Sequence, residues 1–551
     1  QCTLVLSSVT DGAFKVGAGY VRLNNCTFDF GLNAVAISAI KFLNSETSEV
    51  YIDGCSFFGE PFVGDFIGYS GGYGIDFLNL VNDPNINPFP RVYISGCDFQ
   101  GVSAIKQNSA PLSGISVNLC VMPVDFSVQF ASNCEIVNSD IGIHSISGAT
   151  ENLSLVGNRS LNGGAITLNG AHNNAMIIDN RGSLIVGGTL TNTSMTGHKG
   201  TVAGGVLSVV DNCIISGCSF DSFTNLSSLK LVGTSFVNCT FDTDVMFNLD
   251  GSGVSIDSSV FDGYVVFSGV PSDFAFRFNR GIAVDSVVEF ESVVSESIVS
   301  DNIGFSIDFI SGISGTKVSD NIANSGSKYL RVRGDTCTQS TVSGNIIDQI
   351  NFNAASAISS SVIQNICQLM QFGSDTNVAN YQFVSAIGNT VAGSIKVFDS
   401  VSGSGGTCVF QDILLDANIC SSVEILSNLN SSANVSVSRL VLSGLTTDTI
   451  VVSQADATFS GNIVSIENLS ILSSTITDSI VLFGSKNDFT DVAMTYEGTL
   501  IADTTAISIK IGRLSISSAW TQVNFRNAIL NNVRLETISA VPYEMYNFYV
   551  S

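Results

Sequence analysis

The sequence predicts an all-β fold, a right-handed parallel β-helix built from stacked coils of about 19–24 residues. Two observations lead to this prediction: a short strand pattern that recurs along the chain, and a composition that suits sheets. Of the 551 residues, 13% are charged and 45% are hydrophobic, and Ser, Asn, Gly and Thr dominate the remainder. These proportions are unlike those of a disordered acidic chain or a helical protein, so a well-buried β-rich fold is expected.

The recurring pattern consists of two aliphatic residues on alternate positions, two small or polar residues, and then Cys-x-Phe. Its clearest copies and their variants lie at residues 21–28, 50–57, 92–99, 213–220, 234–241 and 254–261. Alternation with a period of two is typical of a strand. The two-residue interruption indicates a bend, so each unit of the pattern predicts a strand, a corner and a second strand.

Asn replaces Cys at the same position farther along the chain, and this position measures the coil. Its occupants are, in order, Asn158, Asn180, Cys218, Cys239, Ser259, Asn279, Asn302, Asn321, Asn345, Asn365, Asn389, Asn418 and Asn462. Most steps between them lie between 19 and 24 residues, which indicates a solenoid. Residues stacked about 4.8 Å apart would form Asn ladders and apolar Cys or Phe columns. We therefore expect Cys26, Cys55, Cys97, Cys218 and Cys239 to be interior free thiols.

Leucine-rich repeats share this period, but they require Leu-x-x-Leu-x-Leu before the Asn, where this chain has Val, Ile, Phe and Ser. Residues 215–220, 318–322 and 342–346 instead resemble the repeat of the pectate-lyase-like right-handed β-helix superfamily. The resemblance covers roughly residues 21 to 466. That superfamily includes polysaccharide lyases, glycoside hydrolases, bacterial surface proteins, and phage tail spikes and fibres, so the resemblance implies a fold and not one function.

Domain organisation follows from where the pattern holds. We expect an N-terminal entry segment at residues 1–20, a β-helix over 21–519, and a C-terminal cap or oligomerisation segment over 520–551. The last segment concentrates aromatic residues and begins at Trp520, the only tryptophan. An open β-helix end needs a cover, because its edge strands expose unpaired backbone groups.

A loop excursion from the β-helix is expected at residues 59–91, which hold several of the eight prolines. Proline cannot donate to a sheet ladder, and loops on rigid scaffolds often carry recognition. Tyr69, Tyr73, Phe89 and Arg91 are therefore the candidate residues for partner or receptor contact. The alternative is a surface loop that only covers the coil beneath it.

Charge and cysteine usage exclude several classes of partner. The 47 acidic and 22 basic residues give a formal charge of −25, which would repel a phosphate backbone, so we expect no nucleic-acid binding. No uninterrupted apolar run of about twenty residues occurs, so we expect no membrane insertion. The 13 cysteines form no CxxC and no Cys/His group with metal-ligand spacing, so we predict no metal site and no cofactor.

Candidate catalytic groups are sparse. Pectate-lyase-like enzymes carry a calcium-binding acidic cluster with a basic residue, and the related hydrolases carry Gly-His-Gly and Arg-Ile-Lys motifs, neither of which occurs here. Solvated outward strand faces explain the nearest acidic groups, which are Asp242, Asp244, Asp250, Glu289, Glu291 and Glu296. Strand and turn positions explain the three histidines, which are His144, His172 and His198. The tripeptide at residues 333–335 reads Arg-Gly-Asp and is expected in a long chain by chance. We assign no catalytic residue.

The composition favours a structural or attachment protein of a virion, most like a tail spike, a fibre or a capsid-surface component. Weakly charged coil faces suit a subunit covered by copies of itself or by other virion proteins, at the virion surface or outside the cell. A host-surface glycan or receptor is the other expected partner. We predict a homo-oligomer without lyase or hydrolase activity. A secreted polysaccharide lyase or glycoside hydrolase is the alternative, and a cell-surface adhesin is a second alternative.

Overall fold

A computed structural model describes most of the chain up to residue 452 and the strands beyond it; from residue 451 on, it describes the backbone alone. The described ranges are 2–5, 14–16, 19–30, 38–42, 48–58, 73–76, 91–100, 103–106, 112–123, 126–142, 144–161, 163–204, 208–224, 230–249, 253–323, 327–374, 380–400, 407–425, 434–452, 464–472, 475–483, 485–490, 492–494, 499–503, 509–511, 514–516, 522–526, 529–530, 543–546 and 549–550.

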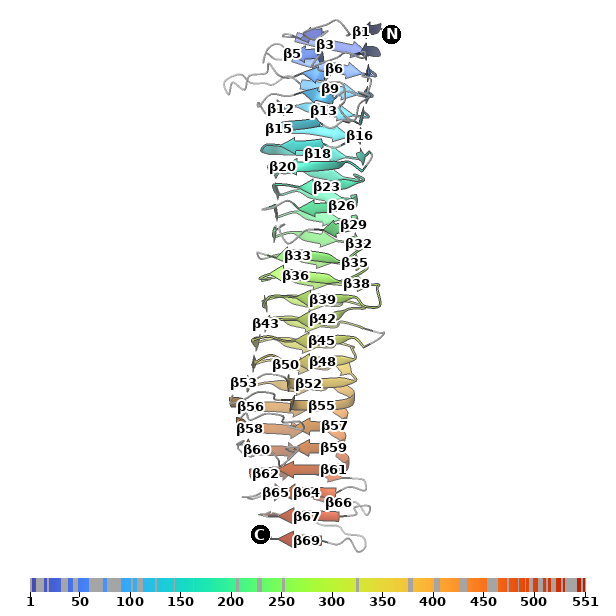
Figure 1. Cartoon of the computed structure of the whole chain (residues 1–551). Helices are drawn as coiled ribbons and strands as arrows, with labels where there is room; N and C mark the ends of the chain where they lie inside the picture. The colour runs from blue at the N-terminus through green and yellow to red at the C-terminus, as the bar shows by residue number, and fades with distance from the viewer. Residues whose placement is uncertain are drawn as a thin grey trace, which may run out of the picture. The chain divides into compact units, whose positions relative to one another are not determined.

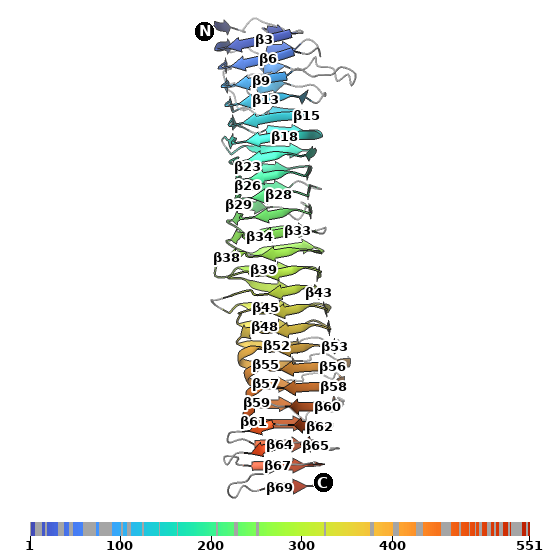
Figure 2. The same ribbon diagram turned by 180° about the vertical axis from the view of Figure 1, so that it is seen from behind.

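The chain divides into two compact units, Gln1–Asp262 (unit 1) and Gly263–Ser551 (unit 2). Each unit is a parallel β-solenoid in which a strand pairs with the corresponding strands of the coils before and after it (Figure 1, Figure 2). The described residues form strands, turns and bends but no helix, and so none that could span a membrane. The predicted fold class, an all-β parallel β-helix, is confirmed.

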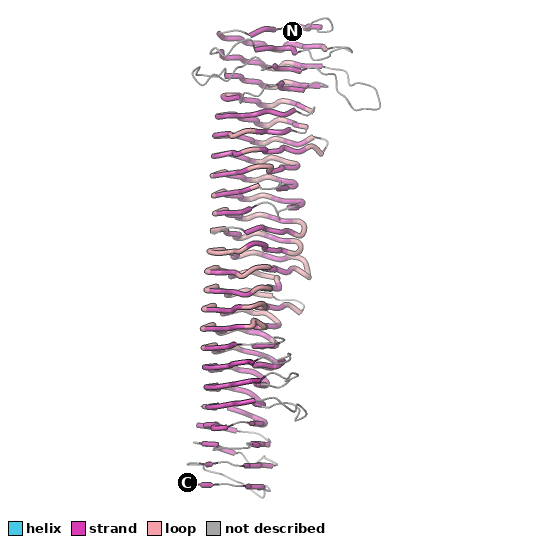
Figure 3. Tube along the Cα trace, turned by 60° about the vertical axis from the view of Figure 1, so that its left-hand side comes forward, coloured by secondary structure: helices cyan, strands magenta, loops and turns pink. Residues whose placement is uncertain are grey.

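Each coil runs through four sides, here called D, A, B and C in chain order, and strands of one side stack from coil to coil (Figure 3). In unit 1, side A holds β3 (Gly19–Asn24), β6 (Ser48–Asp53), β9 (Arg91–Ser95), β13 (Ile115–Asn118), β22 (Met176–Ile178), β25 (Ser194–Thr196), β28 (Ile214–Ser216), β31 (Ser235–Val237) and β34 (Ser255–Asp257). Side B holds β1 (Cys2–Val5), β4 (Cys26–Asp29), β7 (Ser56–Phe58), β10 (Asp98–Gln100), β14 (Val121–Met122), β16 (Asp140–Ile141), β19 (Arg159–Ser160), β32 (Thr240–Phe241) and β35 (Val260–Phe261). Side C holds β2 (Phe14–Val16), β5 (Ser38–Phe42), β8 (Tyr73–Asp76), β11 (Ser103–Lys106), β17 (His144–Ser147), β20 (Ala165–Asn169), β23 (Ser183–Val186) and β33 (Val245–Leu249), and side D holds β12 (Leu112–Ser113), β21 (Ala171–Asn173), β24 (Thr189–Thr191), β27 (Val209–Asp211) and β30 (Lys230–Val232). Longer strands cross a corner: β15 (Phe126–Val137), β18 (Thr150–Val156), β26 (Lys199–Gly204) and β29 (Ser219–Thr224).

Unit 2 repeats this plan. Side A holds β37 (Ala275–Arg277), β41 (Ile298–Ser300), β44 (Lys317–Ser319), β47 (Thr341–Ser343), β50 (Ser361–Ile363), β54 (Ser385–Ile387), β65 (Ile509–Ile511), β68 (Ile529–Leu530) and β70 (Tyr549–Val550), and side B holds β38 (Arg280–Gly281), β51 (Ile366–Cys367), β63 (Val492–Met494) and β66 (Leu514–Ile516). Side C holds β36 (Val265–Gly269), β39 (Val287–Phe290), β42 (Ser306–Phe309), β45 (Tyr329–Val332), β48 (Gln349–Phe352), β52 (Leu369–Ser374), β64 (Thr499–Asp503), β67 (Gln522–Arg526) and β69 (Tyr543–Tyr546), and side D holds β40 (Val294–Ser295), β43 (Gly312–Ser314), β46 (Thr336–Thr338), β49 (Ser356–Ile358) and β53 (Asn380–Gln382). The strands that cross a corner are β55 (Thr390–Ser400), β56 (Thr407–Asp416), β57 (Ile419–Ile425), β58 (Asn434–Ser443), β59 (Thr446–Val452), β60 (Val464–Leu472), β61 (Thr475–Phe483) and β62 (Ser485–Thr490).

The corner between sides A and B explains the sequence pattern. The residue before each ladder position has a positive φ, for example 52° at Asn25, 58° at Gly217 and 66° at Gly344. Asn, Asp and Gly tolerate this left-handed conformation best, which is why they recur there. The chain then turns the ladder side chain inward, so the predicted bend is confirmed.

The predicted ladder residues that the structure describes are all buried. In unit 2 they are joined by hydrogen bonds from coil to coil: Asn321 Nδ2 donates to Asn345 Oδ1 at 2.8 Å, and Asn345 Nδ2 donates to Asn365 Oδ1 at 2.9 Å. The one predicted ladder residue outside the described residues is Asn462. The ladder also has three members in unit 1 that the sequence pattern did not reveal: Cys120, Ser139 and His198.

The prediction of interior thiols is confirmed for Cys55, Cys97, Cys218 and Cys239, which are buried and form no disulfide with another described residue. Cys26 is only half-buried, so it does not lie fully in the interior. Their sulfurs donate to backbone carbonyls, as Cys239 Sγ does to Ile215 O at 3.5 Å. Phenylalanine rings stack beside them, and in unit 2 the stacked pairs Phe267–Phe290 and Phe290–Phe309 have centroids 4.9 and 4.8 Å apart. These columns form the core.

Described strands lie within two of the predicted segments. Within residues 59–91, Tyr73–Asp76 form β8, which pairs with β5 and β11, so the chain returns to side C before β9. Within residues 520–551, β67 pairs with β69 and β68 pairs with β70, both in parallel, so coil pairing continues to Val550. Trp520 lies outside the described residues, and the capping role of this segment stays a prediction.

Candidate functional site

The four residues predicted to contact a partner are only partly described. Tyr73 is the first residue of β8, where its backbone pairs with Ser38 and Ser103. Arg91 begins β9 and is exposed. Tyr69, Phe89 and the side chain of Tyr73 lie outside what the structure describes, and the contact role of the four residues stays a prediction.

The histidines of unit 1 do not form a catalytic group in the described residues. His172 and His198 are 1% and 2% exposed, and burial lowers the pKa of each to about 4. Thr150 Oγ1 hydrogen-bonds to His172 Nδ1, and the Phe220 ring lies 6.4 Å from that of His198. Of His144 only the backbone is described, paired with Phe126 and Ile166. The two buried rings are neutral core residues.

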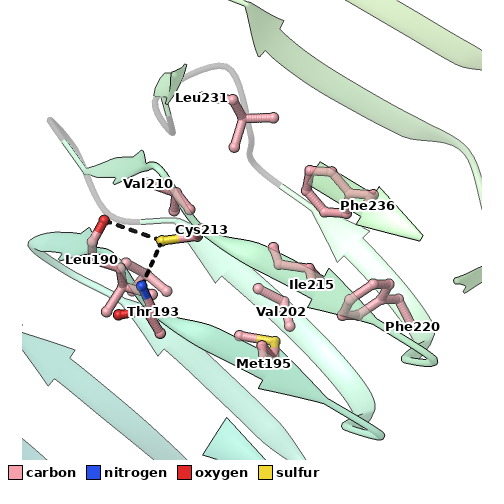
Figure 4. Close-up of a pocket in the computed structure, with 11 residues that line it drawn as sticks. Leu190, Thr193, Met195, Val202, Val210, Cys213, Ile215, Phe220, Leu231 and Phe236 are labelled. Carbon is pink, nitrogen blue, oxygen red and sulfur yellow. Dashed lines mark hydrogen bonds between the residues drawn. The ribbon is translucent and has the colours of Figure 1, made fainter. Parts of the chain in front are cut away.

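An internal cavity of about 20 Å³ lies in unit 1 among aliphatic and aromatic side chains, including Met195, Val202 and Phe236 (Figure 4). Two of its lining residues are polar, and both are already bonded: Thr193 Oγ1 donates to Thr191 O at 3.1 Å, and Cys213 Sγ donates to Leu190 O at 3.5 Å. A buried water needs several polar partners. The cavity is therefore a dry packing gap and not a ligand site.

A column of polar side chains on side C of unit 2 is the best candidate site. It has one residue from each of seven successive strands, here called the polar ladder: Glu289, Asp308, Arg331, Asn351, Gln371, Lys396 and Glu424. Each ladder residue is preceded and followed by buried core residues, as Asp308 is by Ile307 and Phe309. Because side chains alternate across a strand, the ladder points away from the core. Neighbouring members are one strand spacing apart, about 4.8 Å.

Asp308 is the electrostatic centre of the polar ladder. The guanidinium of Arg333, which follows β45, donates to both of its carboxylate oxygens, and the Nε bond is 2.9 Å long. The Asp308 side chain is 3% exposed although it points outward, whereas that of Arg333 is 43% exposed. A bidentate pair of this kind is geometrically specific. Asp308 is thus a buried carboxyl group that Arg333 holds in one orientation.

Glu289 lies beside Asp308 on the adjacent strand and behaves differently. Burial raises the pKa of Glu289, and the negative charge of Asp308 raises it further, against a lowering effect from Arg333. On the other side of Asp308, Arg331 stacks over the Tyr329 ring, with its Cζ 3.7 Å from the ring centroid. The two neighbouring carboxyl groups therefore differ, since Asp308 is paired with Arg333 while the pKa of Glu289 is raised.

The middle of the polar ladder holds polar atoms that the described protein does not satisfy. Asn351 is 7% exposed, and its Oδ1 is buried without a hydrogen-bond partner among the described residues. Asn353 Oδ1, two residues farther along the chain, has none there either. A buried, unpaired carbonyl oxygen costs free energy of about 1–3 kcal/mol. Such atoms indicate a place where water or a ligand hydroxyl donates a hydrogen bond.

Farther along unit 2 the polar ladder is bonded within itself. Lys396 Nζ lies 3.5 Å from Glu424 Oε2, and Glu424 Oε1 accepts from Ser394 Oγ at 3.1 Å and Ser422 Oγ at 3.2 Å. Gln371, between Asn351 and Lys396, is half-buried. The open hydrogen-bonding capacity therefore lies around Arg331, Asn351 and Gln371.

The polar ladder offers acceptors and donors in a straight row but no metal centre. The part of the chain that the structure describes contains no group of three or more His, Cys, Asp or Glu residues that could hold a metal ion. Carboxylate and amide oxygens accept hydrogen bonds, and guanidinium, ammonium and amide groups donate them. This combination suits a ligand with many hydroxyl groups. It also supplies two unlike carboxyl groups, which acid–base chemistry requires.

Sequence reasoning placed Glu289 and Glu291 on an outward strand face, and for Glu289 the structure agrees, but the rest of the polar ladder was missed. We attributed the Arg-Gly-Asp tripeptide at residues 333–335 to chance. In the structure its arginine, Arg333, donates a hydrogen bond to Asp308. The available signal was periodic: polar residues between two apolar ones recur at each coil, as in Ile307-Asp308-Phe309 and Leu330-Arg331-Val332.

Comparison with known proteins gives no similarity on which a function can rest. No family model matches the chain, and no curated protein matches it. Among solved structures the chain is similar to the PL6 family alginate lyase AlyGC, with 9% sequence identity over 98% of this chain and 97% of that one. The TM-score is 0.17, so this similarity carries no argument about function.

Proposed function

We propose that the chain is a structural attachment protein, of the kind found on a virion surface, whose rigid β-helix presents the polar ladder to a host-surface glycan. The observation that carries the proposal is the polar ladder itself. Arg331, Asn351 and Gln371 stand in register on three successive strands, with the Oδ1 of Asn351 buried and unpaired among the described residues.

A glycan is the ligand class that fits this row best. Its hydroxyl groups both donate and accept, so they satisfy the Asn351 carbonyl oxygen and the Arg331 guanidinium together. A polymer of repeated sugars also matches a site that repeats once per coil. The formal charge of −25 disfavours nucleic acid, because it would repel the phosphate backbone.

We prefer attachment to catalysis because the residues of the site suit binding of a ligand better than cleavage of it. Asp308 is bonded to Arg333 on both oxygens, and a guanidinium group donates hydrogen bonds but accepts none. The two histidines with described side chains are buried and neutral in unit 1. A virion-surface location and partner virion proteins remain part of the proposal.

The proposal is tested by glycan-array screening of the full chain, followed by calorimetry with the best ligand. Replacing Arg331 and Gln371 with Ala should weaken binding at least tenfold, since each side chain loses its hydrogen bonds to hydroxyl groups. Thr167→Ala is the matched control, because Thr167 holds an outward position on side C of unit 1. Equal binding by the double variant, or no glycan bound at all, would reject the proposal.

Glycoside hydrolysis is a second candidate, favoured by the raised pKa of Glu289 beside Asp308, whose carboxyl group is paired with Arg333. Most glycosidases use one protonated and one ionised carboxyl group. Reducing-end release from the bound glycan would measure this activity, and Glu289→Gln should abolish release while leaving binding within a few-fold. Release by the Glu289→Gln variant at the original rate would exclude Glu289 as the acid.

A further inference from the structure

Unit 2 carries a row of exposed isoleucines at the start of side B, one position after the ladder asparagines. Ile303, Ile346, Ile366 and Ile419 are 46%, 40%, 49% and 53% exposed, and here they are called the isoleucine ridge. These residues are in register from coil to coil. The register runs in the order Ile303, Ile322, Ile346, Ile366, Thr390 and Ile419, so a half-buried isoleucine and a threonine also belong to the row. The ridge is one residue wide and several coils long.

The fold does not require isoleucine at these positions. In unit 1, four successive coils have charged residues at the corresponding position, again one after a ladder residue: Asp140, Arg159, Arg181 and Lys199. Arg159 pairs with Asp140 there, with Nη2 2.7 Å from Oδ2. The same coil position therefore accepts charged side chains, and isoleucine in unit 2 needs another reason. Single exposed apolar residues are ordinary, but a continuous row of them marks a contact surface.

Two phenylalanines add an independent observation. Phe278 and Phe383 have φ values of 56° and 55°, in the left-handed region that bulky residues avoid. Their side chains are 59% and 57% exposed, so no packing within the described protein compensates for the backbone strain. Phe278 stands at the corner directly before ladder residue Asn279, where Gly344 and Gly388 stand in later coils. Strain of this kind is retained where the exposed side chain has a function.

Beside Ile366 and Ile419 the described surface is also poor in charge, whereas Asp301 and Asp320 stand at the corner two residues before Ile303 and Ile322. The outward residues of the neighbouring strands β50, β54 and β56 include Ile363, Ile387 and Leu414, all half-buried. Ser361 and Ser385 lie beside them and bond to each other at 3.1 Å. Asp416, the carboxylate at the end of β56, accepts a hydrogen bond from Ser443 at 2.7 Å. A face of this composition loses little on desolvation.

We propose that the isoleucine ridge is the interface between copies of this chain, packed side by side, parallel and in register. A second copy presents isoleucine at the same axial interval of about 4.8 Å, so each isoleucine meets its own counterpart. Each copy has a formal charge of −25, so copies repel except where a surface lacks acidic groups, as the ridge does around Ile366. Polar ligands gain nothing from a row without donors or acceptors.

The first test measures the mass of the full chain in solution by light scattering during size-exclusion chromatography. The wild type should be a homo-oligomer at micromolar concentration, and Ile366→Asp combined with Ile346→Asp should be a monomer with an unchanged circular dichroism spectrum. Ile214→Asp is the matched control, since Ile214 is 58% exposed on side A of unit 1, and it should leave assembly intact. A monomeric wild type, or an oligomeric double variant, would overturn the proposal.

The second test reads the orientation of the copies by cross-linking through introduced cysteines and a mild thiol oxidant. Ile303→Cys should cross-link to itself, and so should Ile419→Cys, because parallel copies place identical residues at one height. If a cross-link formed only between Ile303→Cys and Ile419→Cys in a mixture of the two variants, the copies would be antiparallel. That result would refute the proposed parallel, in-register packing. The ridge and the polar ladder use different residues, so glycan binding by the Ile366→Asp variant separates this proposal from the attachment function.

Discussion

The two units build the same coil with different materials. In unit 1 the interior ladder mixes cysteine, serine, asparagine and histidine, and its outward neighbours Asp140, Arg159 and Lys199 are charged. In unit 2 the described ladder from Asn279 to Asn418 is asparagine throughout, and its outward neighbours are mostly isoleucine. The interior position demands a side chain that fits a left-handed corner and bonds to its neighbours, and several residue types meet that demand. The fold does not restrict the outward position that follows each ladder residue. The residue type found there therefore indicates what that surface contacts.

The largest expected difference between the units is their response to acid. His172 and His198 are buried in unit 1, and unit 2 contains no histidine. Burial lowers the pKa of each to about 4, below the unfolded value of about 6.5. Each neutral ring therefore contributes stability that is present above about pH 6.5 and lost as the pH falls toward 4, up to about 3 kcal/mol per histidine.

Hydrogen exchange, corrected for intrinsic rates, should show unit 1 losing protection before unit 2 as the pH falls from about 6.5 to 4. His198→Asn is the informative variant, because it restores the ladder residue of Asn158 and Asn180 and removes one titrating group. It should shift the loss of protection in unit 1 to lower pH. If both units lost protection at the same pH, the buried histidines would not explain the response to acid.

Ladder chemistry should give the next largest difference. Asn345→Ala removes the acceptor of two bonds from Asn321, at 3.1 and 2.8 Å, and the donor to Asn365. Several buried groups lose their partners, so the free energy of unfolding should fall by about 3 kcal/mol. Cys239→Ala removes one sulfur that makes a 3.5 Å bond to a carbonyl, and should cost about 1 kcal/mol.

Urea unfolding of both variants, followed by circular dichroism, measures the difference. Cys239→Ser serves as a control that keeps the size of the side chain and the bond to the Ile215 carbonyl. If Asn345→Ala and Cys239→Ala lowered the free energy of unfolding by similar amounts, the side-chain hydrogen bonds of the asparagine ladder would add no stability beyond that of side-chain packing.

The smallest expected difference concerns ion pairs. The Asp308 side chain of unit 2 is 3% exposed in its pair with Arg333, whereas Asp140 and Arg159 of unit 1 are 32% and 60% exposed. Asp308→Ala should lower the free energy of unfolding by about 1–2 kcal/mol, since it leaves a partly buried guanidinium unpaired. Asp140→Ala should cost at most about 0.5 kcal/mol. Thermal unfolding in low and high salt checks the comparison, and a larger effect of Asp140→Ala would refute it.

The sequence alone predicted the coil because the corner between sides A and B constrains two adjacent positions strongly. A left-handed residue and a small inward residue recur at every corner, and their spacing reveals the period. His198 was missed because a buried imidazole fits a position otherwise held by Cys or Asn, so the step from Asn180 to Cys218 covers two coils. Residue types alone did not identify it as a ladder member.

The polar ladder was harder to predict for a geometric reason. Asp308 and Arg331 are 23 residues apart and Arg331 and Asn351 are 20 apart, so only the register of the coils brings them into one row. A shift of one residue would turn all of these side chains inward. Glu289 was visible as an outward acid, but its raised pKa depends on Asp308 beside it, which no local pattern indicates.

The asparagine ladder is compatible with coils of different lengths. Asn302 and Asn321 are 19 residues apart and Asn389 and Asn418 are 29 apart, yet both pairs share the same side-chain hydrogen bond, 2.9 Å in one and 2.8 Å in the other. Ten additional residues thus enter a coil without disturbing the rung above or below, because loop closure costs little and each coil touches only its neighbours. An engineer could use this property directly. Foreign peptides inserted at chosen corners would be displayed at heights set by whole numbers of coils, as on a molecular ruler.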